Sequence, residues 1–86
     1  MEIIFISNQI KYDILKILDL PAAQSYNLHG TTVLDSIGYG KDEELYRKLE
    51  NKLQEIANEY QTGRLISRGD LSNETTVRQC IQLVLL

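Results

Sequence analysis

Residues 38–63 read GYGKDEELYRKLENKLQEIANEYQTG, and this stretch decides the fold that we expect for the chain. Acidic residues at positions 42–44 suit the N-terminal end of a helix, and Gly63 suits a left-handed cap after its last turn. The apolar residues between them recur at spacings of four and three and form one stripe: Leu45, Leu49, Leu53, Ile56 and Tyr60. One long amphipathic helix with a glycine-containing turn on each side is therefore predicted.

The totals describe a small globular domain. The chain has 86 residues, 43% of them hydrophobic, and five glycines with one proline argue against disorder. A domain of this size often gains stability by pairing, so we expect a homo-oligomer. The net charge of −3 makes nucleic acid an improbable partner, because non-specific binding to nucleic acid needs a basic face.

Cysteine usage and hydropathy indicate a cytoplasmic protein. The single Cys80 has no partner for an internal disulfide and gives no metal-ligand spacing. The apolar run at residues 3–6 is too short for a signal peptide, and no stretch approaches the length needed to cross a membrane. We expect no membrane association and no metal.

Three further segments read as strands. Residues 2–7 (EIIFIS) are apolar and β-branched, residues 31–37 (TTVLDSI) are β-branched, and residues 64–67 (RLIS) form a short third run. Between the first two, Asn8 can cap a helix over residues 10–18 that Pro21 ends.

The last segment, residues 75–86, fits two structures. Its β-branched start and its lack of charge after Arg78 favour a fourth strand, reached through the polar connection at residues 69–74. Val77, Cys80, Ile81, Val84 and Leu85 also match a helical stripe, with Ser72 or Asn73 as cap. The predicted fold is therefore a single α+β domain with the order β-α-β-α-β-β, in which two helices cover one face of a four-stranded sheet. The alternative order is β-α-β-α-β-α, as in thioredoxin-like folds.

Two loops at the ends of the long helix are the candidate ligand site. Gly38, Gly40 and Lys41 lead into the helix, where glycines allow close approach of a phosphate and N–H groups can donate to it. The competing interpretation is a simple turn, since the acidic residues that follow would repel an anion. Thr62, Gly63 and Arg64 lie at the other end, where a helix cap is the competing interpretation.

No motif indicates catalysis. His29 has no partner at triad or ligand spacing, Cys80 lies in an apolar stretch that favours a buried structural thiol, and most Asp and Glu residues decorate a solvated helix face. We therefore expect no enzyme activity and no cofactor.

Short windows resemble known families. Residues 32–40 (TVLDSIGYG), 44–47 and 61–64 (QTGR), with the helix at 10–18, resemble parts of PII signal-transduction proteins. That resemblance implies a trimeric regulator that binds an adenine nucleotide between subunits. It also implies that the matching site positions are Gly38, Gly40, Thr62, Gly63 and Arg64. Residues 69–73 with Val77, Ile81 and Leu83 resemble the last helix of the clock protein KaiB, and the β-α-β-α-β-β order resembles Alba-type nucleic-acid binders.

The leading hypothesis is a non-enzymatic regulatory or interaction module. It would act through protein partners and self-associate through a sheet edge or the apolar end at residues 83–86. The alternatives are a PII-like sensor of a small ligand such as an adenine nucleotide and an Alba-like nucleic-acid binder, which the acidic composition disfavours.

Overall fold

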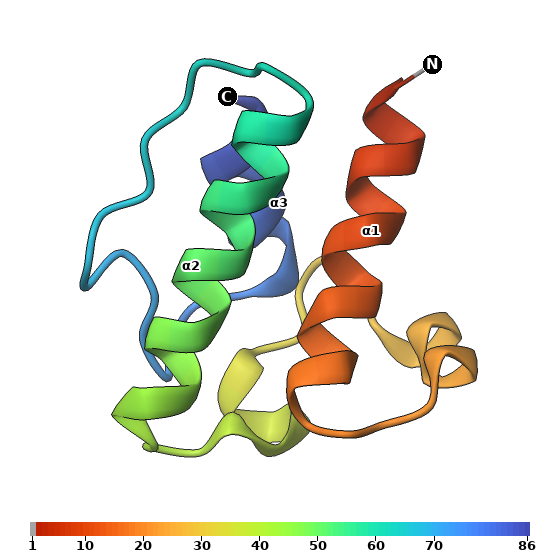
Figure 1. The fold of residues 1–86 in the computed structure, drawn as a ribbon. Coiled ribbons are helices and arrows are strands. Elements are labelled where there is room, and N and C mark those ends of the chain that lie inside the picture. The colour runs from red at the N-terminus through yellow and green to blue at the C-terminus, as the bar shows by residue number, and fades with distance from the viewer. Residues whose placement is uncertain (1) are drawn as a thin grey trace.

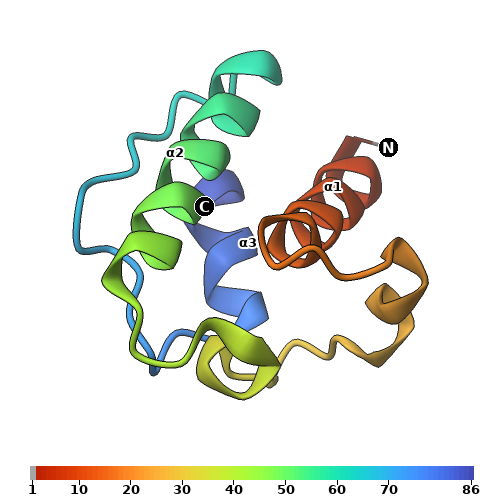
Figure 2. The ribbon, with the colours of Figure 1, turned by 60° about the horizontal axis from the view of Figure 1, so that its bottom comes forward.

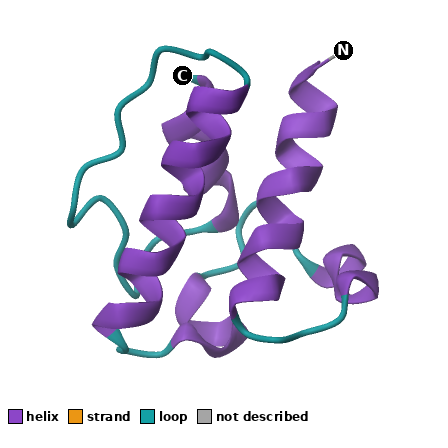
Figure 3. Cartoon of the chain, viewed as in Figure 1, coloured by secondary structure: helices purple, strands orange, loops and turns teal. Residues whose placement is uncertain are grey.

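Residues 2–86 are described by a computed structural model, and every regular element in this part of the chain is a helix (Figure 3). Extended pairing within these residues is confined to one isolated antiparallel bridge between Val33 and Thr76. The predicted four-stranded α+β sandwich is therefore wrong, as are the alternative β-α-β-α-β-α order and a PII-like or Alba-like architecture, which would need a sheet. The elements in chain order are α1 (Glu2–Ile17), the 3₁₀ helix η1 (Ala22–Asn27), the π-helix η2 (Asp35–Tyr39), α2 (Glu43–Glu59) and α3 (Val77–Leu85).

The predicted strand at residues 2–7 is instead the first part of α1. Ile6, Ile10 and Ile14 recur every four residues and are all buried, so one helical stripe continues through Asn8 without a break. An apolar β-branched run also suits a strand, but a strand needs a neighbour for its backbone groups. A helix pairs those groups internally, which removes that need.

The end of α1 lies close to the predicted stop at Pro21. The N–H groups of Asp19 and Leu20 donate to the carbonyl oxygens of Lys16 and Leu15, each at 3.0 Å. Asp19 adopts a positive φ of 59°. This pair of bonds is the Schellman motif, which satisfies carbonyl groups that the last helical turn leaves open.

The predicted second strand at residues 31–37 divides into two parts. Its first half runs beside the start of α3. The N–H of Leu34 donates to the Thr75 carbonyl oxygen at 2.9 Å, and the N–H of Val77 donates to the Thr32 carbonyl oxygen at 2.9 Å. Its second half turns into η2. The β-branched residues thus do extend, but too briefly to form a strand.

The predicted long helix is confirmed as α2. The side chain of Asp42 caps its start by accepting a hydrogen bond from the N–H of Glu44 at 3.0 Å. The left-handed residue that ends it is Gln61, with φ 54°, two positions before the predicted Gly63. Its buried residues include Leu49, Leu53 and Ile56, members of the predicted stripe.

The last segment adopts the helical alternative, so the predicted fourth strand is wrong. Thr76 caps α3, in place of the expected Ser72 or Asn73. The Thr76 hydroxyl accepts from the Gln79 N–H at 3.2 Å, and the Gln79 side-chain oxygen accepts from the Thr76 N–H at 2.9 Å. This reciprocal capping box fixes the start of the helix.

The three α-helices pack against one another around one core. α1 and α2 lie side by side and run in opposite directions, and α3 lies behind them, runs in the direction of α2 and contacts both (Figures 1 and 2). The largest fully buried side chains are Tyr39, Ile10, Ile14, Leu15, Leu34, Leu49, Leu53, Leu71, Val77, Val84 and Cys80.

A long connection follows from the shared direction of α2 and α3. The 17 residues of α2 span about 25 Å, and the chain must return along that length before α3 can begin. Residues 61–72, here called the strap, run back beside α2 (Figure 1). The predicted third strand at residues 64–67 lies in the strap, where its backbone pairs with a side chain of α2 rather than with another strand.

Candidate functional site

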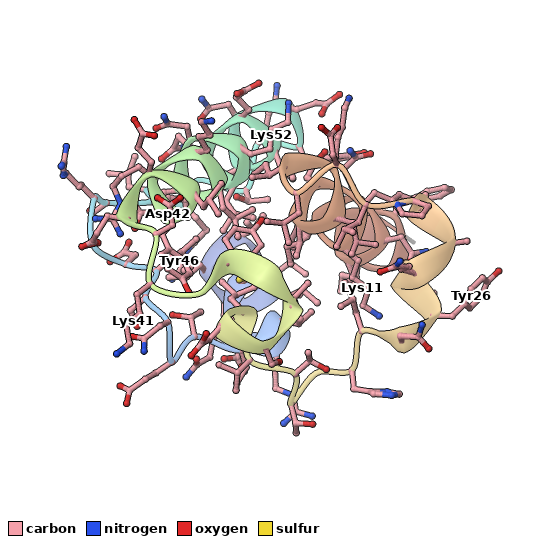
Figure 4. All side chains as sticks on the ribbon, turned by 90° about the horizontal axis from the view of Figure 1, so that it is seen from below. Lys11, Tyr26, Lys41, Asp42, Tyr46 and Lys52 are labelled. Atoms are coloured by element: carbon pink, nitrogen blue, oxygen red, sulfur yellow. The ribbon has the colours of Figure 1, made fainter. Side chains whose placement is uncertain are left out.

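The first predicted ligand loop begins within η2, where Gly38 interrupts the helical geometry, and leads into α2. Gly38 and Gly40 have φ values of 142° and 56°, so each occupies a conformation that favours glycine. A Cβ on Gly38 would also approach the Leu18 side chain to 3.3 Å. Lys41 lies at the surface beside Asp42 (Figure 4). The turn geometry accounts for both glycines without a ligand.

The second predicted ligand loop lies at the far end of α2. Thr62, Gly63 and Arg64 follow the helix, whereas Gly38, Gly40 and Lys41 precede it. The helix between them spans about 25 Å, so the two loops do not meet in one copy of the chain. A nucleotide site built from both loops would have to form between copies.

Each predicted loop borders a separate hollow. The side chain of Lys41 lines one of about 420 Å³, with Glu43, Tyr46, Ser72 and Asn73. Arg64 lines a larger open groove of about 630 Å³ between the strap and α3. The residues that line this groove are Arg64, Asp70, Ser72, Glu74, Thr75, Gln79, Gln82, Leu83 and Leu86.

Two side chains were considered for chemistry, those of Cys80 and His29. Cys80 lies in the core, as predicted for a buried structural thiol. Cys80 is fully buried, and burial raises the pKa of its thiol to about 12. Such a thiol is a poor nucleophile at neutral pH. His29 is exposed in a turn. Within residues 2–86, no group of His, Cys, Asp and Glu side chains is arranged to hold a metal ion.

The most distinctive surface feature is the first turn of α1. Ile3, Ile4 and Phe5, here called the apolar turn, are 63%, 65% and 69% exposed. They lie at the end of the molecule marked N in Figure 1. The sequence carries no charged residue from position 3 to position 10, whereas charged residues make up 24% of the whole chain. Exposed apolar side chains gathered in one helical turn are typical of an interaction site.

Our sequence interpretation missed the apolar turn because it assigned residues 2–7 to a strand. The angle between successive helical residues is the sequence signal that could have revealed the apolar turn. Successive helical residues point about 100° apart, so Ile3, Ile4 and Phe5 cannot all face one core. Once the Ile6, Ile10 and Ile14 stripe is recognised as helical, at least part of the preceding run must be exposed.

Comparison of the chain with protein-family models, with curated proteins and with solved structures found no match. No helix within residues 2–86 combines the length and the apolar character needed to cross a bilayer.

Proposed function

We propose that this chain is a non-enzymatic interaction module that assembles with a second copy of itself through the apolar turn. The observation that carries the proposal is the exposure of Ile3, Ile4 and Phe5, each about two-thirds accessible although it belongs to a regular helix. Other exposed large apolar residues lie outside this three-residue run: Tyr12, Tyr26, Leu65 and Leu86. Isolated exposed apolar residues are normal on a protein surface, whereas three in succession indicate a surface that a partner covers.

Charge favours a second copy as the partner. In a two-fold assembly each surface meets an identical one, so a charged surface would repel itself. The uncharged stretch at residues 3–10 avoids this cost in a chain whose net charge of −3 makes its copies repel elsewhere. Asn8 lies exposed on the same helix and adds a polar but uncharged group to the rim.

The expected assembly is weak and concentration-dependent. Burying a side chain of this size fully is worth about 1.5–3 kcal/mol. Because successive helical residues point about 100° apart, one partner surface covers two neighbouring side chains of the apolar turn, Ile4 and Phe5, from each copy. Their burial stands against an association cost of about 4–15 kcal/mol. The proposal therefore predicts an interface below the standard size, formed reversibly as concentration rises.

Light scattering after size-exclusion chromatography tests the proposal on a matched pair of double variants. Ile4→Lys with Phe5→Lys places two charges on the apolar turn, and Tyr26→Lys with Leu65→Lys places two charges on residues that are 88% and 84% exposed elsewhere. All four sites are exposed, so we expect both variants to melt close to the wild type.

The wild type and the Tyr26/Leu65 control should gain mass as concentration rises, whereas the Ile4/Phe5 variant should stay monomeric. A wild type that is monomeric at every concentration would contradict the proposal. So would an Ile4/Phe5 variant that assembles as the wild type does.

A further inference from the structure

We propose that the groove between α3 and the strap binds an extended peptide in which a basic residue lies next to apolar residues. The groove measures about 630 Å³ and is open to solvent. Its size falls within the range of protein ligand sites, about 300–1,000 Å³. It is separate from the apolar turn, which contributes no residue to its lining.

The chain itself shows how a glutamine side chain can hold an extended backbone. The Gln54 amide on α2 donates to the Arg64 carbonyl oxygen at 3.2 Å and accepts from the Ile66 N–H at 2.7 Å. It thereby pairs with alternate residues of the strap, as a neighbouring strand would. One amide group thus supplies both the donor and the acceptor that an extended segment needs.

Gln82 offers the same pair of groups to the groove. Its side-chain amide lines the groove and makes no hydrogen bond with another side chain or backbone group of residues 2–86. Gln79 lies three residues earlier on the same helix face. Its oxygen is occupied by the Thr76 N–H, but its amide N–H groups remain as donors toward the groove.

The remaining lining specifies the side chains of the peptide. Leu83 and Leu86 supply apolar contact, and Leu86 is 72% exposed without an occupant. The lining includes two acidic residues, Asp70 and Glu74, and one basic residue, Arg64. One oxygen of the Asp70 carboxylate also accepts from the Ser67 N–H at 2.7 Å. A basic residue complements this excess of negative charge, whereas a phosphate or a nucleotide would meet two like charges.

Two short peptides serve as probes: acetyl-Gly-Leu-Lys-Leu-Gly-amide and its charge-reversed counterpart with Glu in place of Lys. Binding is followed on the intact protein through the NMR signals of the glutamine side-chain amides. We expect the Lys peptide to shift the Gln79 and Gln82 signals and to bind about tenfold more tightly than the Glu peptide, a difference of about 1.4 kcal/mol. The Ile4/Phe5 double variant should bind it equally well, which separates this inference from the assembly proposed above.

Gln82→Ala should weaken binding of the Lys peptide about tenfold, whereas Gln24→Ala, which changes an exposed glutamine of η1, should leave it unchanged. Both sites are exposed, so the melting temperature should stay constant and loss of folding cannot imitate loss of binding. Equal affinity for the two peptides, equal affinity of the Gln82 and Gln24 variants, or binding of ATP but of neither peptide would overturn the inference. Absence of binding by both peptides would overturn it as well.

Discussion

Tyr39 joins the first helix to the turn that precedes the second. Its hydroxyl donates to the carbonyl oxygen of Ile14 at 2.8 Å, and that carbonyl is one of the last four in α1, which lack a partner within the helix. Its ring stacks on that of Tyr46, with the ring centres 5.4 Å apart. The Tyr46 hydroxyl in turn donates to the Gly40 carbonyl oxygen. One buried phenol thus acts as a cap for a helix 25 positions away in the sequence.

Tyr39→Phe should lower the free energy of unfolding by about 1–3 kcal/mol, because the Ile14 carbonyl loses a buried hydrogen-bond donor while the ring packing stays. Urea unfolding followed by circular dichroism measures the change. Tyr26→Phe is the matched control, since Tyr26 is 88% exposed and points away from the molecule (Figure 4). Equal unfolding midpoints for the two variants would show that the bond contributes nothing.

Cys80 should make the fold sensitive to alkaline pH. Burial raises the pKa of its thiol from an ordinary value of 9.0 to about 12, and burial likewise raises the pKa of Tyr39. The folded state keeps these protons where the unfolded chain releases them, so this contribution to stability is complete below pH 9.0 and is lost as pH rises toward 12. Each group can remove up to about 1.4 kcal/mol per pH unit in that window.

Urea midpoints between neutral and alkaline pH measure this effect. Cys80→Ala should show a shallower decline above pH 9.0 than the wild type, even if its stability at neutral pH is lower. Parallel declines for the two proteins would mean that the thiol does not titrate differently in the folded and unfolded states.

At the scale of the elements, a polar stripe on α2 takes the place of a sheet. Arg47, Glu50 and Gln54 recur at spacings of three and four and hold the strap along the helix. The buried Glu50 carboxylate accepts from the N–H groups of Gly69 and Leu71, both at 2.9 Å. Its other oxygen lies 2.8 Å from Nε of Arg47, an ion pair rather than an aligned hydrogen bond. These contacts supply hydrogen-bond partners for backbone groups of the extended strap, which has no neighbouring strand.

Glu50→Gln should loosen the strap, because an amide offers one acceptor oxygen where the carboxylate offers two. The change also leaves Arg47 with only its longer ion pair, to Glu43 at 3.8 Å. We expect a loss of about 3 kcal/mol in the free energy of unfolding, with faster hydrogen exchange at Gly69 and Leu71. Glu55→Gln on the exposed face of the same helix should change little, since Glu55 makes only a surface ion pair with Lys52 at 3.8 Å. Unchanged hydrogen exchange at Gly69 and Leu71 in the Glu50 variant would show that the polar stripe does not hold the strap.

The contrast between α2 and the predicted strands shows what local pattern can and cannot decide. α2 was predictable because five apolar residues repeat with helical spacing and the acidic start agrees with them. A strand depends on a partner elsewhere in the chain, and β-branched runs such as residues 31–37 and 64–67 do not reveal whether one exists. The segment at residues 75–86 matched both patterns, and the capping box formed by Thr76 and Gln79 was the local signal in favour of a helix.

At the scale of the whole molecule, the direction of the helices decides which predicted site residues can act together. The two glycine-containing loops were correctly predicted to flank one helix, but a helix of this length keeps its two ends apart. The groove depends on how the strap lies beside α3, and the apolar turn depends on where α1 stops meeting its neighbours. The groove is not encoded in local spacing, and only Arg64 of the predicted ligand residues lines it.

Isoleucine-methyl NMR over a dilution series is the most direct test of assembly through the apolar turn. The Ile3 and Ile4 methyl groups are exposed at that surface, whereas those of Ile10 and Ile14 are fully buried in the core of the same helix. We expect the first pair of signals to shift as concentration rises while the second pair stays constant. Signals of Ile3 and Ile4 that do not change at any concentration would contradict the account, and so would equal shifts for all four residues.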